Sequence, residues 1–245
     1  MTVLRPKLWT SLSAAVLLGA GVAACGAGGE ADQTAETPSA PAQAVGEGGE
    51  AAELGAAEAY GSIPAESKTA LQLAHLKGFF LIAQHQKDGA EAAAALAGQG
   101  LLEVFDKDPD AFRAAGVDEA VLRKAAQSGA EADLAAAIAN LDAAAAKAGG
   151  DAAEVAKGLI SVAEGIYRGV VVDDVVDPIE YQHSLGAILA AQAVAARSEG
   201  DARLAAARAE LDKLAGMWAG PTAPEAPTAP AQVSAQASRV QLALS

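Results

Sequence analysis

Apolar residues recur every three or four positions along most of the chain from about residue 62, and this spacing predicts amphipathic α-helices. In the segment 130–147, for example, Leu134, Ile138 and Leu141 are four and three residues apart. Glycine commonly ends a helix and Asp or Ser commonly begins one, and such residues separate the periodic stretches here. The predicted helices cover approximately residues 62–89, 90–105, 109–116, 118–129, 130–147, 151–169, 178–199 and 201–219.

These stretches predict an all-α helical bundle of about six to eight helices over residues 62–220. The only segment with strand character is Gly-Val-Val-Val at residues 169–172. Because no second run of this kind pairs with it, we interpret it as a helix end followed by a loop. Residues 221–245 are rich in proline and alanine. We expect an extended segment at 221–227 and a loose or marginally helical one at 233–245.

The first 24 residues have the parts of an export signal peptide. Arg5 and Lys7 form a short basic start, and an uncharged, mostly apolar segment follows at residues 8–22. That segment is shorter than the roughly 20 residues of an ordinary transmembrane helix. It ends in small residues of the kind that precede a signal-peptide cleavage site. The pattern therefore predicts that the chain is exported.

The end of this signal, Val22-Ala23-Ala24-Cys25, resembles the lipobox of bacterial lipoproteins. The resemblance implies cleavage before Cys25, followed by acylation of its sulfur and of its new amino group. Several acyl chains hold a protein on a membrane stably, whereas a single chain binds only marginally. In a Gram-negative cell, Gly26 at the next position implies the outer membrane, with periplasmic or surface exposure or later release. The alternative is a plain secretory signal followed by a chance cysteine.

Residues 25–61 consist largely of Gly, Ala, Glu, Gln, Pro and Thr. Such a composition buries too little apolar surface to order itself. We therefore expect a flexible tether between the lipidated cysteine and the helical domain. Within it, residues 51–60 have a weak helical pattern.

Hydrophobic residues make up 52% of the chain, but aromatic residues only 4%. Most of the hydrophobic fraction is alanine, which favours thin, closely spaced helices. The formal net charge is −14, and the absence of a cluster of Lys and Arg makes nucleic acid an unsuitable partner. Because the chain has a single cysteine, it has neither an internal disulfide nor the cysteine spacing of a zinc finger.

The pattern H-x-x-G-x-x-x-x-A-Q occurs twice, once beginning at His75 and once at His183. An internal duplication would explain this repeat and would predict two similar helical halves. The two histidine-bearing helices would then lie near a pseudo-two-fold axis, and Gly78 and Gly186 would let them approach closely. The alternative is an ordinary helix–helix contact that the fold uses twice.

Two short segments carry a family resemblance, 73–78 (Leu-Ala-His-Leu-Lys-Gly) and 180–186 (Glu-Tyr-Gln-His-Ser-Leu-Gly). They look like paired signatures of uncharacterised exported bacterial helical proteins. An exported lipoprotein with two histidine-bearing halves is also distantly similar to imelysin-like proteins, which are associated with iron uptake. The imelysin signature G-x-H-x-x-E is absent, because Glu180 precedes His183 instead of following it.

Glu180 and His183 lie three residues apart on a predicted helix, and E-x-x-H is half of the motif of four-helix carboxylate metal sites. The second copy has Gln72 before His75, and an amide is a poor metal ligand, so a dinuclear centre is not expected. A mononuclear site of His75, Glu180 and His183 would suit zinc, copper or iron. Two facing histidines could also bracket a haem. The alternative is a satisfied polar pair inside the bundle, with His183 bonded to Glu180 or Gln72.

Other chemistry finds little support in the sequence. The chain has no G-x-S-x-G nucleophile motif, and its glycine clusters follow no strand, as a phosphate-binding loop would require. We therefore expect a non-enzymatic, membrane-anchored lipoprotein that binds a metal, haem or small ligand at a central His/Glu cluster. The alternative is an accessory or structural lipoprotein that acts on a protein partner at the cell envelope. A weaker third hypothesis is an enzyme with Glu180 and His183 as acid and base, which would need a deep pocket.

Overall fold

The computed structural model describes residues 57–172, 175–198 and 200–245 of the chain. The predicted signal peptide, the predicted lipidation site at Cys25 and most of the predicted tether lie outside these residues and stay predictions. The described part consists almost entirely of α-helices, so the all-α prediction is confirmed. Within that part, no helix combines the length and the apolar character that crossing a membrane requires.

The helices follow the predicted segments closely. Asp side chains cap five of them at the N-terminus by accepting backbone N–H bonds, as Asp at these sites predicts. A short 3-10 helix at Phe105–Lys107 precedes α4. The α-helices are α2 (Ala65–Gln84), α3 (Ala90–Glu103), α4 (Pro109–Ala114), α5 (Glu119–Ser128), α6 (Glu131–Ala148), α7 (Ala152–Tyr167), α8 (Pro178–Arg197), α9 (Ala202–Ala215) and α10 (Pro230–Ala243).

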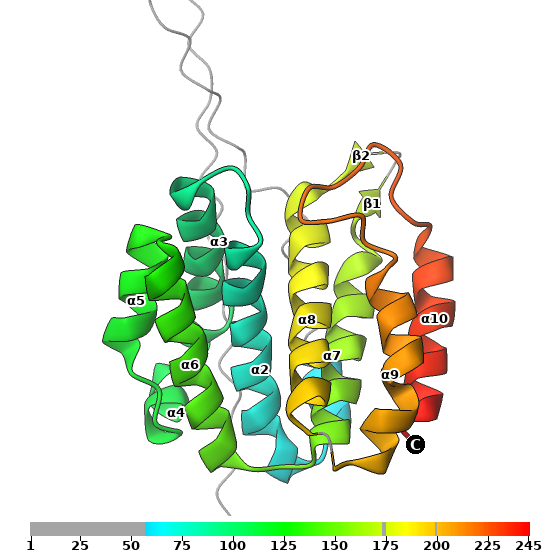
Figure 1. Ribbon diagram of the computed structural model, residues 1–245, viewed down its shortest axis with the longest axis horizontal. Helices are drawn as coiled ribbons and strands as arrows, with labels where there is room; N and C mark the ends of the chain where they lie inside the picture. Colours follow the sequence, from blue (N-terminus) through cyan, green and yellow to red (C-terminus); the bar gives the residue numbers. More distant parts are fainter. Residues whose placement is uncertain (1–56, 173–174, 199) are drawn as a thin grey trace, which may run out of the picture. The chain divides into compact units, whose positions relative to one another are not determined.

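The longer helices form two groups of four, and α2 and α8 lie side by side where the groups meet (Figure 1). In the first group, α2 packs against α3 and α6, while α5 packs against α3 and α6. In the second group, α8 packs against α9 and α7, while α10 packs against α9 and α7. The neighbour pattern is therefore the same in both groups, with α2 in the place of α8. The chain order differs, because α6 follows α2 whereas α7 precedes α8, so the internal duplication stays a prediction.

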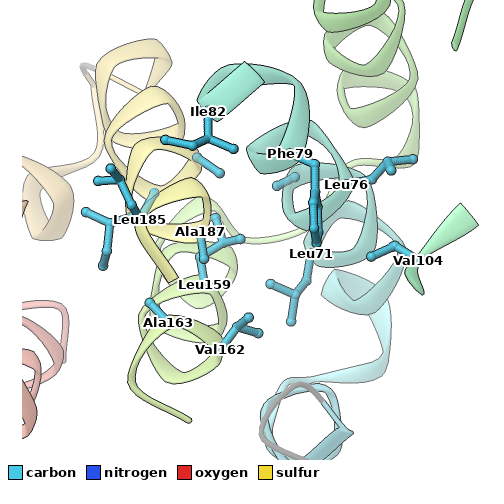
Figure 2. Close-up of a cluster of buried hydrophobic side chains, with 14 of the residues drawn as sticks. Leu71, Leu76, Phe79, Ile82, Val104, Leu159, Val162, Ala163, Leu185 and Ala187 are labelled. Atoms are coloured by element: carbon cyan, nitrogen blue, oxygen red, sulfur yellow. The ribbon is translucent and has the colours of Figure 1, made fainter. Parts of the chain in front are cut away.

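Helices α2 and α8 run in opposite directions and cross at Gly78 and Gly186 (Figure 1). Around the crossing, α2 and α8 together with α7 bury a continuous apolar core (Figure 2). Phe79 of α2, Leu159 of α7 and Ala187 of α8 are all buried in it. Because many of the core residues are alanines, the helices can approach closely, as the composition predicts.

One local prediction is wrong, because a short hairpin replaces the loop expected after residue 169. Strand β1 (Val171–Val172) pairs with β2 (Val175–Val176) in antiparallel register, with Val171 opposite Val176. The partner run is only two residues long, which is why the sequence pattern did not reveal it. The N–H of Asp177 then donates to the carbonyl of Val170 over 2.7 Å, and α8 begins at the next residue.

Of the two expectations for residues 233–245, the loose one is wrong and the helical one holds, because α10 packs against α7 and α9. Its buried residues Val233, Ala237, Val240 and Leu244 are four, three and four residues apart, which is helical spacing. Pro230 occupies the first turn, where its missing N–H costs nothing. The segment looked loose in the sequence because only small or isolated apolar residues carry this pattern.

Candidate functional site

His75 is buried on α2 and is bound by a residue that the sequence assigned to the tether. The hydroxyl of Tyr60 and Nδ1 of His75 are joined by a hydrogen bond of 2.6 Å. The other ring nitrogen, Nε2, has no hydrogen-bond partner among the described residues. The folded domain thus begins before residue 62. In the sequence, the one indication was Tyr60, an aromatic residue among small and polar ones.

His183 is buried on α8 with 2% of its surface exposed, and it makes neither of the two bonds predicted for it. Its Nδ1 lies 3.5 Å from a carboxylate oxygen of Glu103 on α3, which is long for a hydrogen bond. Neither ring nitrogen has a hydrogen-bond partner in the described part of the chain. Glu103 is a second residue of this region that sequence reasoning missed, because it stands at the end of a helix with no histidine near it in the sequence.

The two histidines are separated by an aromatic side chain. The ring of Phe79 lies with its centroid 5.5 Å from that of His75 and 4.7 Å from that of His183. Each histidine lies three residues before the glycine at which the antiparallel helices cross. At 1.5 Å per residue, the two positions are therefore about 9 Å apart along the helix axes.

The predicted metal or haem site finds no support in this geometry, because the ring of Phe79 packs against both imidazoles. Across residues 57–172, 175–198 and 200–245, no three His, Cys, Asp or Glu side chains are grouped so as to hold a metal ion. The geometry therefore does not support a shared centre of His75, Glu180 and His183.

The buried ionisable groups of this region are uncharged near neutral pH. Burial raises the pKa of the Glu180 carboxyl to about 8, and the nearby negative charges of Asp177 and Glu103 add to this shift. Burial also lowers the pKa of His75 to about 3, with a further contribution from His183, and it lowers the pKa of His183 to about 4. The region is therefore a neutral polar seam between the two helical groups.

A cavity of about 380 Å³ lies on another side of α2, where α2, α6, α7 and the end of α8 meet. Its walls are mostly apolar, with Leu73 from α2, Leu141 from α6, Val155 from α7 and Val194 from α8. Ligand sites in proteins are typically concave, mostly apolar and of about 300–1,000 Å³, with a few polar groups. The cavity has these properties, and no pattern in the sequence indicated it.

Three charged side chains line this cavity: Lys77, Asp142 and Arg197. The Lys77 side chain is only 4% exposed, and its amine lies 2.9 Å from Oδ1 of Asp142. The guanidinium of Arg197, which is 43% exposed, also forms an ion pair with Oδ1 of Asp142. Burial lowers the pKa of Lys77, an effect that its ion pair with Asp142 opposes. The cavity is therefore lined by two basic side chains and one acidic side chain.

Lys77 is the functional candidate that sequence reasoning missed. It lies two residues after His75, and a helix turns by 100° per residue, so the two side chains leave α2 in nearly opposite directions. The available signal was a lysine within the otherwise apolar run from Leu71 to Ile82, interrupted only by polar Gln72 and His75. Asp142 and Arg197 gave no signal, because each looks like an ordinary polar residue on an exposed helix face.

Comparisons of this chain with protein-family models, with curated proteins and with solved structures find no match. The resemblances to bacterial lipoproteins and to imelysin-like proteins therefore stay predictions from the sequence.

Proposed function

We propose that this chain is an exported, lipid-anchored binding protein that holds a small ligand in the cavity between α2, α6, α7 and α8. The observation that carries the proposal is the placement of Lys77, a nearly buried cation that faces an apolar cavity of about 380 Å³. Burying a charge is costly, and a mostly apolar cavity with a few polar or charged groups is typical of ligand sites. Binding, with no chemical step, is the activity that this arrangement supports best.

The proposed anchor rests on the sequence. Acylation at Cys25 would fix the N-terminal end at the membrane, and the segment up to residue 56 would tether the helical domain to it. Radiolabelled palmitate should then be incorporated into the expressed chain, and Cys25→Ser should abolish the labelling. Labelling that persists in Cys25→Ser would contradict the anchor without bearing on the cavity.

Binding can be tested with octan-1-ol, an uncharged probe of suitable size. Titration into the purified domain should shift the methyl NMR signals of Leu73, Leu141, Val155 and Val194, which line the cavity. Ala145→Phe should abolish these shifts, because Ala145 lines the cavity and a phenyl ring would fill it. The matched control is Ala143→Phe on the same helix, which is exposed and should bind like the wild type. Equal shifts in both variants would mean that the cavity is not the binding site.

For the alternative function, action on a protein partner, the described part of the chain shows no cluster of large exposed hydrophobic side chains. The large hydrophobic side chains exposed there are Leu102, Val175 and Leu242. They belong to α3, β2 and α10, respectively. Single exposed apolar residues on separate elements are normal for a protein surface. The ligand-binding proposal is therefore the better supported of the two.

A further inference from the structure

We propose that the ligand is a small monocarboxylate with an apolar tail, and that Lys77 and Arg197 together bind its carboxylate. This inference rests on the proposed function, because it names the class of ligand for the same cavity. Three properties of the cavity lead to it: the balance of charges, the depth at which the two cations lie, and the available volume.

The charges lining the cavity do not balance. Lys77 and Arg197 both pair with the same oxygen, Oδ1 of Asp142, and these three are the charged residues among those that line the cavity. One carboxylate therefore serves two cations, in a chain whose net charge is −14. A second carboxylate, supplied by the ligand, would give two negative charges against the two positive ones. A buried charge that is both paired and hydrogen-bonded is far less costly than one that is left uncompensated.

The two cations lie at different depths and differ in chemistry. The Lys77 side chain is 4% exposed, whereas the Arg197 side chain is 43% exposed. The guanidinium can bind a carboxylate through two parallel hydrogen bonds, and the ammonium of Lys77 acts as a point charge. A carboxylate between them would accept two hydrogen bonds from the guanidinium on the solvent side. It would face the ammonium of Lys77 on the interior side. Its tail would contact Leu73, Val155 and the other apolar walls.

The volume indicates the size of ligand that the cavity can hold. One water molecule takes about 30 Å³ of the liquid, and a cavity of about 380 Å³ therefore accommodates about a dozen non-hydrogen atoms on that scale. A straight-chain acid of about eight to ten carbons has this size. An amine of the same length would face two like charges, with only Asp142 to pair with, and an alcohol would leave the excess positive charge uncompensated.

The test compares octanoate, octan-1-ol and octylamine, which share a tail and differ in charge, by calorimetric titration into the full helical domain. Octanoate should bind about tenfold more tightly than octan-1-ol, since one charge-assisted hydrogen bond is worth about one order of magnitude in affinity. Octylamine should bind more weakly than either. If octan-1-ol binds and octanoate is no tighter, the carboxylate inference is overturned and the proposed function stands. If none of the three binds, the proposed function is overturned as well.

Two variants test whether Arg197 and Asp142 determine the preference for octanoate. Arg197→Gln, at an exposed position that should not disturb folding, should reduce the preference for octanoate about tenfold. Asp142→Asn removes the competing carboxylate, so it should tighten octanoate binding and weaken octylamine binding further. A merely structural ion pair would not produce that gain. Unchanged or weakened octanoate binding in folded Asp142→Asn would overturn the inference.

Discussion

Gly78 of α2 and Gly186 of α8 contact each other backbone to backbone, and the contact is reciprocal. A Cβ atom placed on Gly78 would lie 2.6 Å from the carbonyl oxygen of Gly186, and one placed on Gly186 would lie 2.8 Å from that of Gly78. No side chain fits at either position unless the helices move apart. The contact therefore fixes the spacing of α2 and α8, and with it the positions of His75, Lys77 and His183 relative to the rest of the fold.

Gly78→Ala should destabilise the domain. Overpacking a tight contact typically costs about 1–3 kcal/mol, and alanine recovers only about 1 kcal/mol through its better helix propensity. We expect a net loss of up to about 2 kcal/mol in the free energy of unfolding, measured by urea denaturation followed by circular dichroism.

The matched control is Gly98→Ala on α3, where a Cβ would meet nothing within 4 Å. With no contact to disturb, the propensity gain alone should apply, and this variant should be more stable by up to about 1 kcal/mol. If the two substitutions changed stability in the same direction, the close contact at Gly78 would have no energetic role.

This contact was also the part of the central architecture that the sequence could predict. The repeat at His75 and His183 placed a glycine three residues after each histidine, and small residues at equivalent positions indicate close helix packing. The positions of helix starts were equally readable, because Asp177 and the other capping residues act within one turn of the chain. Such features depend on neighbours in the sequence.

The cavity could not be predicted in the same way. Lys77 pairs with Asp142, which is 65 residues away in the chain (142 − 77), and the pair exists only because α2 and α6 pack together. The interposition of Phe79 between the histidines likewise depends on where α8 crosses α2. The sequence placed the candidate site at the buried residues His75 and His183, whereas the cavity is lined by Lys77 and its neighbours on another side of α2.

Glu180 should make the domain less stable as the pH rises. Its pKa of about 8 in the folded protein lies above the ordinary value of 4.5, so the folded state holds the proton more tightly than the unfolded state. Its favourable contribution is complete below pH 4.5 and is lost as the pH rises to about 8. Glu180→Gln should remove this part of the pH dependence, as measured by urea denaturation at a series of pH values.

The control for that experiment is Glu58→Gln, which alters an exposed carboxyl. It should leave the slope of the free energy of unfolding against pH unchanged. The decisive range is pH 5 to 8. A slope there that is as steep in Glu180→Gln as in the wild type would show that Glu180 is not the group responsible.

The histidines should produce the opposite trend at acid pH. The pKa of His183 is lowered from 6.5 to about 4 in the folded protein, so the unfolded state takes up a proton first as the pH falls. Stability present above pH 6.5 is therefore lost between pH 6.5 and about 4. His183→Gln should reduce this loss, while His85→Gln, at the exposed end of α2, should leave it intact. Equal acid sensitivity in both variants would contradict the role assigned to His183.

Tyr60→Phe should show whether the folded domain extends into the segment that the sequence assigned to the tether. The substitution removes the 2.6 Å hydrogen bond to Nδ1 of His75 and leaves a buried ring with no partner at either nitrogen, because Nε2 has none in the described structure. Leaving a buried polar atom unpaired costs about 1–3 kcal/mol, so the free energy of unfolding should fall by that amount in urea denaturation.

Ser62→Ala is the matched control, since Ser62 is exposed and donates only a local hydrogen bond of 2.8 Å to the carbonyl of Ala59. Its expected cost is below about 1 kcal/mol. If Tyr60 belonged to a tether, both variants would unfold at the same urea concentration as the wild type. The bond to His75 would then contribute nothing to the free energy of unfolding.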